Sequence, residues 1–410
     1  MYKESTLDNG LKILTYEDTS IPVIDIKLVF KAGSRYEKSH EKGYAHILEH
    51  MLMKGTVKRP TPVLIAKEID NKGGYTNAYT SRESLSIVLQ AADNYSEELF
   101  ELLSDMLFNS LIDSSILENE KKVIIEELKR ANDDTESFFW RFTYEKLFNG
   151  HPLASNILGD PESIMTASTD ELKEYKNKFL VPSNSALIVS GNIDHDRVLM
   201  LAKKYFKEWS GVGGIISPVE FEPITREPYF CTRDIKQTFL GYSFYTVPVS
   251  KIKESVALEL VQNFLNFGGS SVLKEELRHK RGLIYSVALR NATFSDAGLF
   301  SIKTSTSKPK ETIDAIENII RNLKNLFTKD FLEGVKTRHI GAFKLRITNP
   351  YNQNSFLSSG FLDLGKLITP EEYITEINSI SYEDILNIID TYLRPEKALI
   401  TAVGPEDFTG

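Results

Sequence analysis

Two histidines and a glutamate stand within five residues of one another near the start of the chain. Residues 43–56 read Gly-Tyr-Ala-His-Ile-Leu-Glu-His-Met-Leu-Met-Lys-Gly-Thr, a pattern that predicts one helix ending at Gly55. On a helix, His46 and His50 share a face because they are four residues apart, and Glu49 lies at the edge of that face. Two imidazoles and a nearby carboxylate are what a catalytic zinc ion needs: two nitrogen ligands, and a base beside a water molecule. The order His-x-x-Glu-His is the inverted form of the commoner zinc-peptidase motif.

A third zinc ligand must come from another segment, because catalytic zinc sites usually have three protein ligands. The apolar pattern predicts a long helical segment over 114–148. Within it, Glu120 and Glu127 are seven residues apart and therefore face the same way. A carboxylate from this segment is a reasonable donor, but the chemistry alone does not choose between Glu126 and Glu127.

The composition is that of a folded protein with more than one domain. The chain has 410 residues, which is more than one hydrophobic core usually supports. Hydrophobic residues make up 41% and charged residues 26%, and the net charge of −8 argues against nucleic acid as a partner. Cys231 is the one cysteine, so neither a disulfide framework nor a thiolate metal cage is expected. No apolar run is long enough for a membrane span and no targeting signal is evident, so we expect a cytoplasmic protein without membrane partners.

The chain carries the signs of an internal duplication. Residues 168–191 and 381–404 each read as a helix, a proline turn and a buried strand, and the two helix starts are 213 residues apart. A glycine- and proline-rich stretch over 211–227 lies between the two halves and reads as a linker. We therefore expect a zinc-binding N-terminal domain over 1–210 and a C-terminal domain of the same α+β fold over 228–410.

The second half lacks the metal motif. At the same offset, His46, Glu49 and His50 correspond to Glu259, Gln262 and Asn263, in that order. Neither histidine is retained, so these positions offer no imidazole to a zinc ion. One zinc ion per chain is therefore the expectation.

Taken together, these segments give the chain a resemblance to the pitrilysin family of inverzincins, in the subgroup similar to the β subunit of mitochondrial processing peptidase and its bacterial relatives. The resemblance covers essentially the whole chain. It rests on four motifs, at 43–56, 73–80, 120–128 and 268–286. It implies that Glu127 is the third zinc ligand and that Glu120 is the partner that holds the ligands in place.

The resemblance also implies roles outside the metal centre. Residues 73–80 match the family's edge strand against which a substrate peptide lies, which assigns Asn77 and Ala78 to substrate binding. An arginine and a tyrosine seven residues apart in the second domain match Arg278 and Tyr285, which would stabilise the oxyanion of the attacked peptide. The chain lacks the long Gly-rich loop of the mitochondrial α subunit, which argues against an α-type, non-catalytic role.

From these features we expect a zinc endopeptidase that hydrolyses unfolded or short peptides, including presequence-like segments. Glu49 would act as general base. Each of two duplicated domains would be a mainly antiparallel sheet with helices packed on it, and the two would form a clamshell that binds the peptide as an extended strand in the cleft between them. The family pattern implies a dimer; a homodimer is the simpler expectation, and a heterodimer with a zinc-less relative is the alternative. Two other functions remain open: a non-catalytic assembly subunit of the same fold, and a peptidase dedicated to one precursor.

Overall fold

The computed structural model describes residues 1–213, 219, 221 and 228–407. Most of the expected linker, 211–227, lies outside the described residues. The chain divides into two compact units, and each unit gathers segments that are distant in sequence. Unit 1 comprises Met1–Arg130, Ser155–Ser217 and Arg346–Thr369, and unit 2 comprises Ala131–Ala154, Pro218–Leu345 and Pro370–Gly410.

Unit 1 is built on a mixed sheet with the strand order β1-β2-β6-β3-β5-β4. Its strands are β1 (Tyr2–Thr6), β2 (Lys12–Glu17), β3 (Val23–Phe30), β4 (Tyr75–Thr80), β5 (Leu85–Ala92) and β6 (Ser185–Gly191). Its helices are α1 (Tyr44–Met53), α2 (Pro62–Asp70), α3 (Ser96–Phe108), α4 (Ser114–Asp133), α6 (Pro161–Thr166), α7 (Thr169–Phe179), α8 (His195–Phe206) and α13 (Pro350–Leu364). Neighbouring strands are antiparallel except β2 and β6, which run parallel, and β4 lies at one edge of the sheet.

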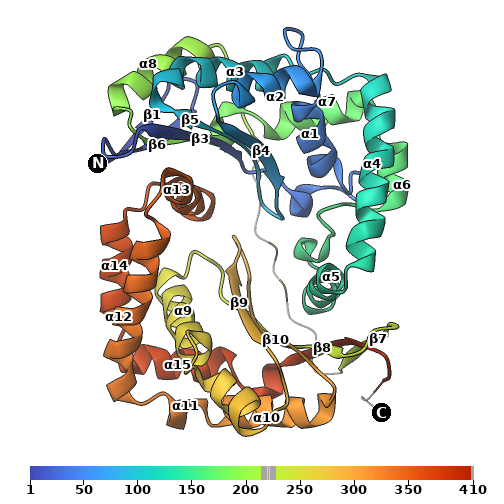
Figure 1. Ribbon diagram of the computed structural model, residues 1–410, viewed down its shortest axis with the longest axis vertical. Helices are drawn as coiled ribbons and strands as arrows, with labels where there is room; N and C mark the ends of the chain where they lie inside the picture. The colour runs from blue at the N-terminus through green and yellow to red at the C-terminus, as the bar shows by residue number, and fades with distance from the viewer. Residues whose placement is uncertain (214–218, 220, 222–227, 408–410) are drawn as a thin grey trace. The chain divides into compact units, whose positions relative to one another are not determined.

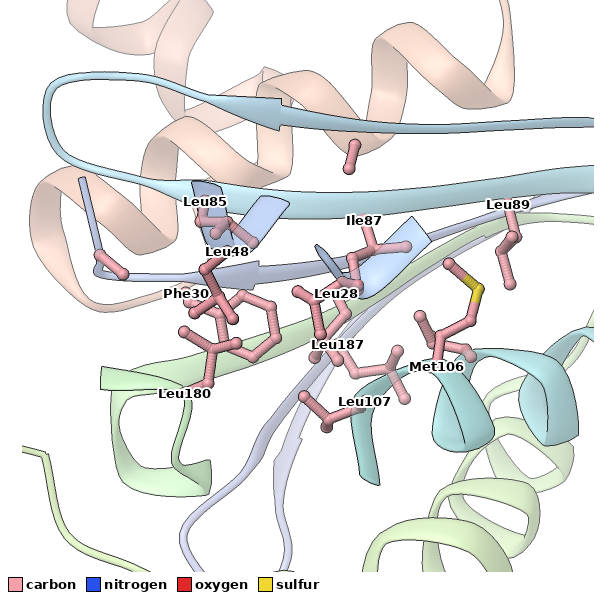
Figure 2. Close-up of a cluster of buried hydrophobic side chains, with 14 of the residues drawn as sticks. Leu28, Phe30, Leu48, Leu85, Ile87, Leu89, Met106, Leu107, Leu180 and Leu187 are labelled. Atoms are coloured by element: carbon pink, nitrogen blue, oxygen red, sulfur yellow. The ribbon is translucent and has the colours of Figure 1, made fainter. Parts of the chain in front are cut away.

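The core of unit 1 lies between this sheet and helices α1 and α3. Side chains two residues apart on a strand point to the same face, so Leu28 and Phe30 of β3 both enter this core, where neither is exposed. Figure 2 shows them beside Leu48 of α1 and Met106 of α3. The zinc-motif helix is therefore fixed to the sheet by its apolar face, which leaves the opposite face for polar side chains.

Unit 2 is built on a sheet with the order β7-β11-β8-β10-β9. Its strands are β7 (Tyr229–Thr232), β8 (Thr238–Thr246), β9 (Val287–Thr293), β10 (Gly298–Thr306) and β11 (Leu399–Gly404). Its helices are α5 (Thr135–Leu147), α9 (Ile252–Asn266), the π-helical segment Lys274–Lys280, α10 (Pro309–Arg321), α11 (Leu323–Leu326), α12 (Lys329–Arg346), α14 (Pro370–Ser379) and α15 (Tyr382–Tyr392). Within the described residues, no helix combines the length and the apolarity needed to cross a membrane.

The two sheets repeat one topology. The parallel pair β2 and β6 in unit 1 corresponds to the parallel pair β7 and β11 in unit 2, and antiparallel strands continue in the same order from there. The repeated helices α7 and α15 also begin alike, since Ser168 and Ser381 each cap their helix in a reciprocal box with the residue three positions on. The predicted fold class, α+β with two duplicated domains of mainly antiparallel sheet and packed helices, is confirmed.

Each unit contains a helix from the other half of the sequence. The long helical segment expected over 114–148 is in fact two helices, because Asp134 is extended (φ −69°, ψ 113°) and its side chain caps the backbone N–H of Ser137. After this break, α5 packs on β8 and β11 of unit 2, whereas α13 packs on β3 and β6 of unit 1 (Figure 1). The predicted domain boundaries, 1–210 and 228–410, stay a prediction. The two compact units differ from these halves of the sequence because α5 and α13 each belong to the unit of the other half.

Candidate metal centre

Helix α1 carries both histidines, and its first turn is held by an acidic side chain. The helix begins after Gly43, whose φ of 97° suits glycine and which has no side chain to cap the helix. The Glu37 side chain takes that role, since it accepts hydrogen bonds from the backbone N–H groups of Gly43 and Ala45, both at 2.9 Å. Burial raises the pKa of Glu37 to about 8, so its side chain acts here as a hydrogen-bond acceptor for N–H groups that have no partner within the helix. Glu37 therefore helps to fix the position of the helix that bears the histidines.

Three potential ligands converge on the polar face of α1. The side chains of His46, His50 and Glu127 each offer one atom, and these atoms all lie within 4.8 Å of one another. Nε2 of His46 is 3.7 Å, and Nε2 of His50 is 3.6 Å, from Oε2 of Glu127. No other such group of His, Cys, Asp and Glu side chains occurs within the described part of the chain. Glu127 faces the histidines, whereas Glu126 points away, with its side chain 71% exposed and bonded to Lys129.

Glu120 lies behind this group, as the seven-residue spacing on α4 predicts. Its Oε2 is 3.0 Å from Nδ1 of His50 and 3.0 Å from Nζ of Lys54. Because Nδ1 is occupied by the carboxylate, Nε2 is the ring nitrogen that His50 turns toward Glu127. Glu120 is buried, so Lys54 supplies the positive charge that a buried carboxylate needs.

Burial shifts the pKa values of two residues of the motif, His46 and Glu49. Desolvation of the imidazole, reinforced by His50, lowers the pKa of His46 to about 4. His46 is therefore neutral at physiological pH, the form in which imidazole binds metals. Burial also raises the pKa of Glu49, with a smaller opposing contribution from a hydrogen bond to Thr80. A carboxylate with a raised pKa is a stronger base.

The edge strand β4 runs beside the base. The hydroxyl of Thr80 donates to Oε2 of Glu49 at 2.5 Å, and the sequence had given no sign of this residue except that it follows Ala78 by two positions on one strand. The backbone N–H of Ala78 donates to the side-chain oxygen of Asn77 at 3.0 Å, so this N–H points away from the pairing with β5. The edge expected to receive substrate is present in the structure, and the substrate roles of Asn77 and Ala78 stay a prediction.

Arg278 and Tyr285 belong to unit 2. The guanidinium carbon of Arg278 lies 5.1 Å from the centre of the Tyr285 ring, which is a cation–π distance. Tyr285 is 77% exposed. The structure thus brings the predicted arginine and tyrosine together, and their part in catalysis stays a prediction.

In unit 2, the position that corresponds to the metal centre is filled by protein side chains. Glu259 of α9, which matches His46 at the repeat offset, accepts a hydrogen bond from Tyr373 and lies 3.3 Å from Nε2 of His339. Asn263, which matches His50, accepts a hydrogen bond of 2.8 Å from Arg338. These polar groups satisfy one another, and the expectation of one zinc ion per chain stays a prediction.

The donor set of unit 1 fits a zinc ion. Two imidazole Nε2 atoms and one carboxylate are a usual protein complement for catalytic zinc, which keeps a position for water. The histidine whose Nδ1 is held by a carboxylate also matches the arrangement that usually orients zinc ligands. A purely structural role explains the positions of His46, His50 and Glu127 less well. Without a metal ion, the three side chains would face one another with no common binding partner.

Two family models describe most of the chain. Residues 12–161 match the model described as "Insulinase (Peptidase family M16)". Residues 166–338 match the model described as "Peptidase M16 inactive domain". The boundary between the two matches lies close to the first helix of the sequence repeat.

Individual relatives agree with these matches. An uncharacterized zinc protease of Rickettsia felis is 29% identical, with 99% of this chain and 98% of the relative covered. The β subunit of the mitochondrial-processing peptidase of Dictyostelium discoideum is 26% identical, with 98% and 88% covered. Among solved structures, a protease from Helicobacter pylori superposes with a TM-score of 0.89 at 20% identity and covers 99% of both chains. A likeness at that identity supports the fold.

Proposed function

Because the chain belongs to peptidase family M16, we propose that it is a zinc-dependent endopeptidase of unfolded or short peptides. The observation that carries this proposal is the convergence of His46, His50 and Glu127 within 4.8 Å, beside the half-buried carboxylate of Glu49. Zinc bound there would act as a Lewis acid toward a water molecule and the peptide carbonyl.

The residues of the chain would share the remaining work. Glu49 would take a proton from the attacking water and pass it to the leaving amine, and its raised pKa suits both steps. Thr80 would hold that carboxylate in place through its hydroxyl. Glu120 would keep His50 in the tautomer that leaves Nε2 as the donor.

Substrate would bind as an added strand along β4. An edge strand offers backbone N–H and C=O groups that a peptide can pair with, so affinity would depend little on side chains. Ala78 supplies one such N–H, which in the free protein is bonded to the side chain of Asn77. Such a mode requires an extended peptide, which favours unfolded or short substrates.

Two further elements of the proposal rest on the family resemblance. Arg278 and Tyr285 would stabilise the oxyanion of the attacked peptide bond. The protein would work as a homodimer in the cytoplasm, with a heterodimer as the alternative; the relative from Dictyostelium is by its name one subunit of an enzyme.

The test is cleavage of a mixed pool of unstructured peptides, read by mass spectrometry. The purified protein is compared with Glu49→Gln, each with and without a chelator, and bound zinc is measured for both. Glu49→Gln keeps the three ligands, so it should bind one zinc ion per chain and cut at least 100-fold more slowly, since general bases contribute roughly 10²–10⁴-fold.

The outcomes separate the alternatives. Cleavage only by the zinc-loaded, unsubstituted protein supports the proposal, and the cut sites give the specificity. Zinc-loaded protein that cuts none of the peptides favours a non-catalytic subunit or a dedicated enzyme that requires a partner. Equal cleavage by both proteins would exclude Glu49 as the base.

A further inference from the structure

We propose that a pocket of unit 1, formed where helices α3, α7 and α8 meet, binds a small organic carboxylate with an aromatic or branched apolar body. The pocket has a volume of about 480 Å³, within the range of small-molecule sites. The residues that matter for the argument are Leu107, Phe108, Lys176, Val181, Tyr205 and Trp209. None of them belongs to the metal centre.

One wall of the pocket is aromatic and firmly held. The ring of Phe108 meets that of Trp209 at 5.9 Å in an edge-on arrangement. The side chain of Asn9 donates to the backbone carbonyls of Trp209 and Phe206, at 2.9 and 2.8 Å, and the Trp209 indole N–H donates to the carbonyl of Leu180 at 3.3 Å. Phe108 nevertheless stays 41% exposed. A pre-formed concave surface with an exposed aromatic ring favours an apolar or aromatic ligand body.

The other wall carries an ammonium group that lacks a counter-ion. Nζ of Lys176 donates to the hydroxyl of Ser110 at 2.9 Å, and no carboxylate of the described residues forms an ion pair with it. Burial lowers the pKa of Lys176 to about 8, which agrees with the absence of an anionic partner. A partly desolvated cation beside an apolar wall is stabilised by an incoming anion, and a hydrogen bond between two charged groups is stronger than one between neutral groups.

The charges around the pocket define the ligand further. Among the described residues that line the pocket, Lys176 is the one cationic side chain and Glu208 the one anionic side chain. The carboxylate of Glu208 is 3.5 Å from Nζ of Lys207. One cation and a nearby anion favour a ligand with a single negative charge over a phosphate or a dicarboxylate. A monocarboxylate with an aromatic or branched apolar body satisfies both walls.

The experiment uses Trp209 as reporter. The chain has 2 tryptophans, so the substitution Trp140→Phe in unit 2 leaves Trp209 as the only indole. The zinc-loaded full chain with this substitution is titrated with 3-phenylpropionate and, in parallel, with the neutral 3-phenylpropionamide, while the fluorescence of Trp209 is followed. The carboxylate is expected to bind at least about tenfold more tightly than the amide, because only the carboxylate forms a charged hydrogen bond with Lys176.

Two lysine variants locate the binding. Lys176→Met should weaken binding of 3-phenylpropionate at least about tenfold, whereas Lys173→Met, an exposed residue of the same helix, should leave it unchanged. If Lys176→Met does not fold, the comparison of carboxylate and amide still decides the matter.

Three results would overturn the proposal. One is the absence of saturable binding below about 10 mM. Another is equal affinity for the carboxylate and the amide. The third is binding that survives Lys176→Met but disappears when zinc is removed, since the carboxylate would then lie on the metal.

Discussion

Oε2 of Glu120 lies 3.0 Å from Nδ1 of His50, and the same oxygen lies 3.0 Å from Nζ of Lys54. This contact links the zinc-motif helix α1 to α4, which carries the third potential ligand. It also fixes which nitrogen of His50 faces Glu127. The geometry of the metal centre therefore depends on a residue that does not itself reach the metal.

We predict that Glu120→Gln lowers zinc affinity by roughly 10–100-fold, the usual effect of losing a partner that orients a ligand. The glutamine oxygen still accepts the hydrogen bond, so the helices should stay packed, but the imidazole loses its anionic partner. Competition with a chelating dye measures the affinity. Glu118→Gln on the same helix, where Glu118 pairs with Lys121, is the matched control. Unchanged zinc affinity in Glu120→Gln would show that Glu120 has no part in orienting His50.

A second prediction distinguishes the two adjacent glutamates of α4. Glu127→Gln should lower zinc affinity by more than about 100-fold, because a ligand matters more than its partner. Glu126→Gln should leave affinity unchanged, since Glu126 is exposed and bonded to Lys129. Zinc content after dialysis, measured on both variants, is the readout. If Glu126→Gln loses zinc and Glu127→Gln retains it, the third ligand is Glu126 and not Glu127.

The sequence alone could predict the part of the centre that lies on one helix. The spacing of His46, Glu49 and His50 determines their common face wherever the helix packs. The choice between Glu126 and Glu127 was different, because it depends on how α4 is rotated against α1, and only the family resemblance favoured Glu127. Thr80 could not be assigned at all, because its contact with Glu49 arises from the docking of a strand on a helix.

The placement of α5 in unit 2 and of α13 in unit 1 could not be predicted from local sequence patterns either. The sequence repeat and the matched capping boxes indicated two similar domains, but local periodicity does not say which sheet a helix covers. The amide of Asn354 in α13 donates to the backbone carbonyl of Asp25 in β3 at 2.7 Å, across 329 positions of the chain. Contacts of this kind place α13 on the sheet of unit 1.

The Asp25 contact leads to a prediction about pH. Burial raises the pKa of the Asp25 carboxyl to about 7 from its ordinary 3.8, against smaller opposing effects of Asn354 and Lys27. The folded protein therefore holds a proton that the unfolded chain has lost between about pH 4 and 7, so the contribution of Asp25 to stability falls as pH rises through this window. Asp25→Asn mimics the protonated form and can still accept from Asn354. The substitution should therefore stabilise the protein more at pH 8 than at pH 4. The difference between the two effects on the free energy of unfolding should be on the order of 1–3 kcal/mol.

Denaturant unfolding at several pH values tests this. The difference between Asp25→Asn and the unsubstituted protein cancels the titration of the other groups, and the exposed Asp314→Asn is the control expected to show no such trend. A difference that does not change between pH 4 and 8 would mean that Asp25 is ionised throughout.

The last prediction concerns the edge of the sheet. The N–H of Ala78 is bonded to the side chain of Asn77 and not to β5, so a proline at this position removes a donor without breaking the sheet. If substrate pairs with this edge, Ala78→Pro should raise KM about 2–10-fold, the loss expected for one backbone hydrogen bond. Because the metal centre is untouched, kcat and zinc content should change little.

Ala78→Gly provides the control for the proline variant, since it also changes the side chain at this position but keeps the backbone N–H. Its KM should therefore stay near that of the unsubstituted protein. Both variants are assayed on one cleaved peptide, with thermal unfolding to verify the fold. A proline variant with unchanged KM and an intact fold would show that substrate does not pair with β4 at Ala78, and the proposed strand addition would have to be abandoned there.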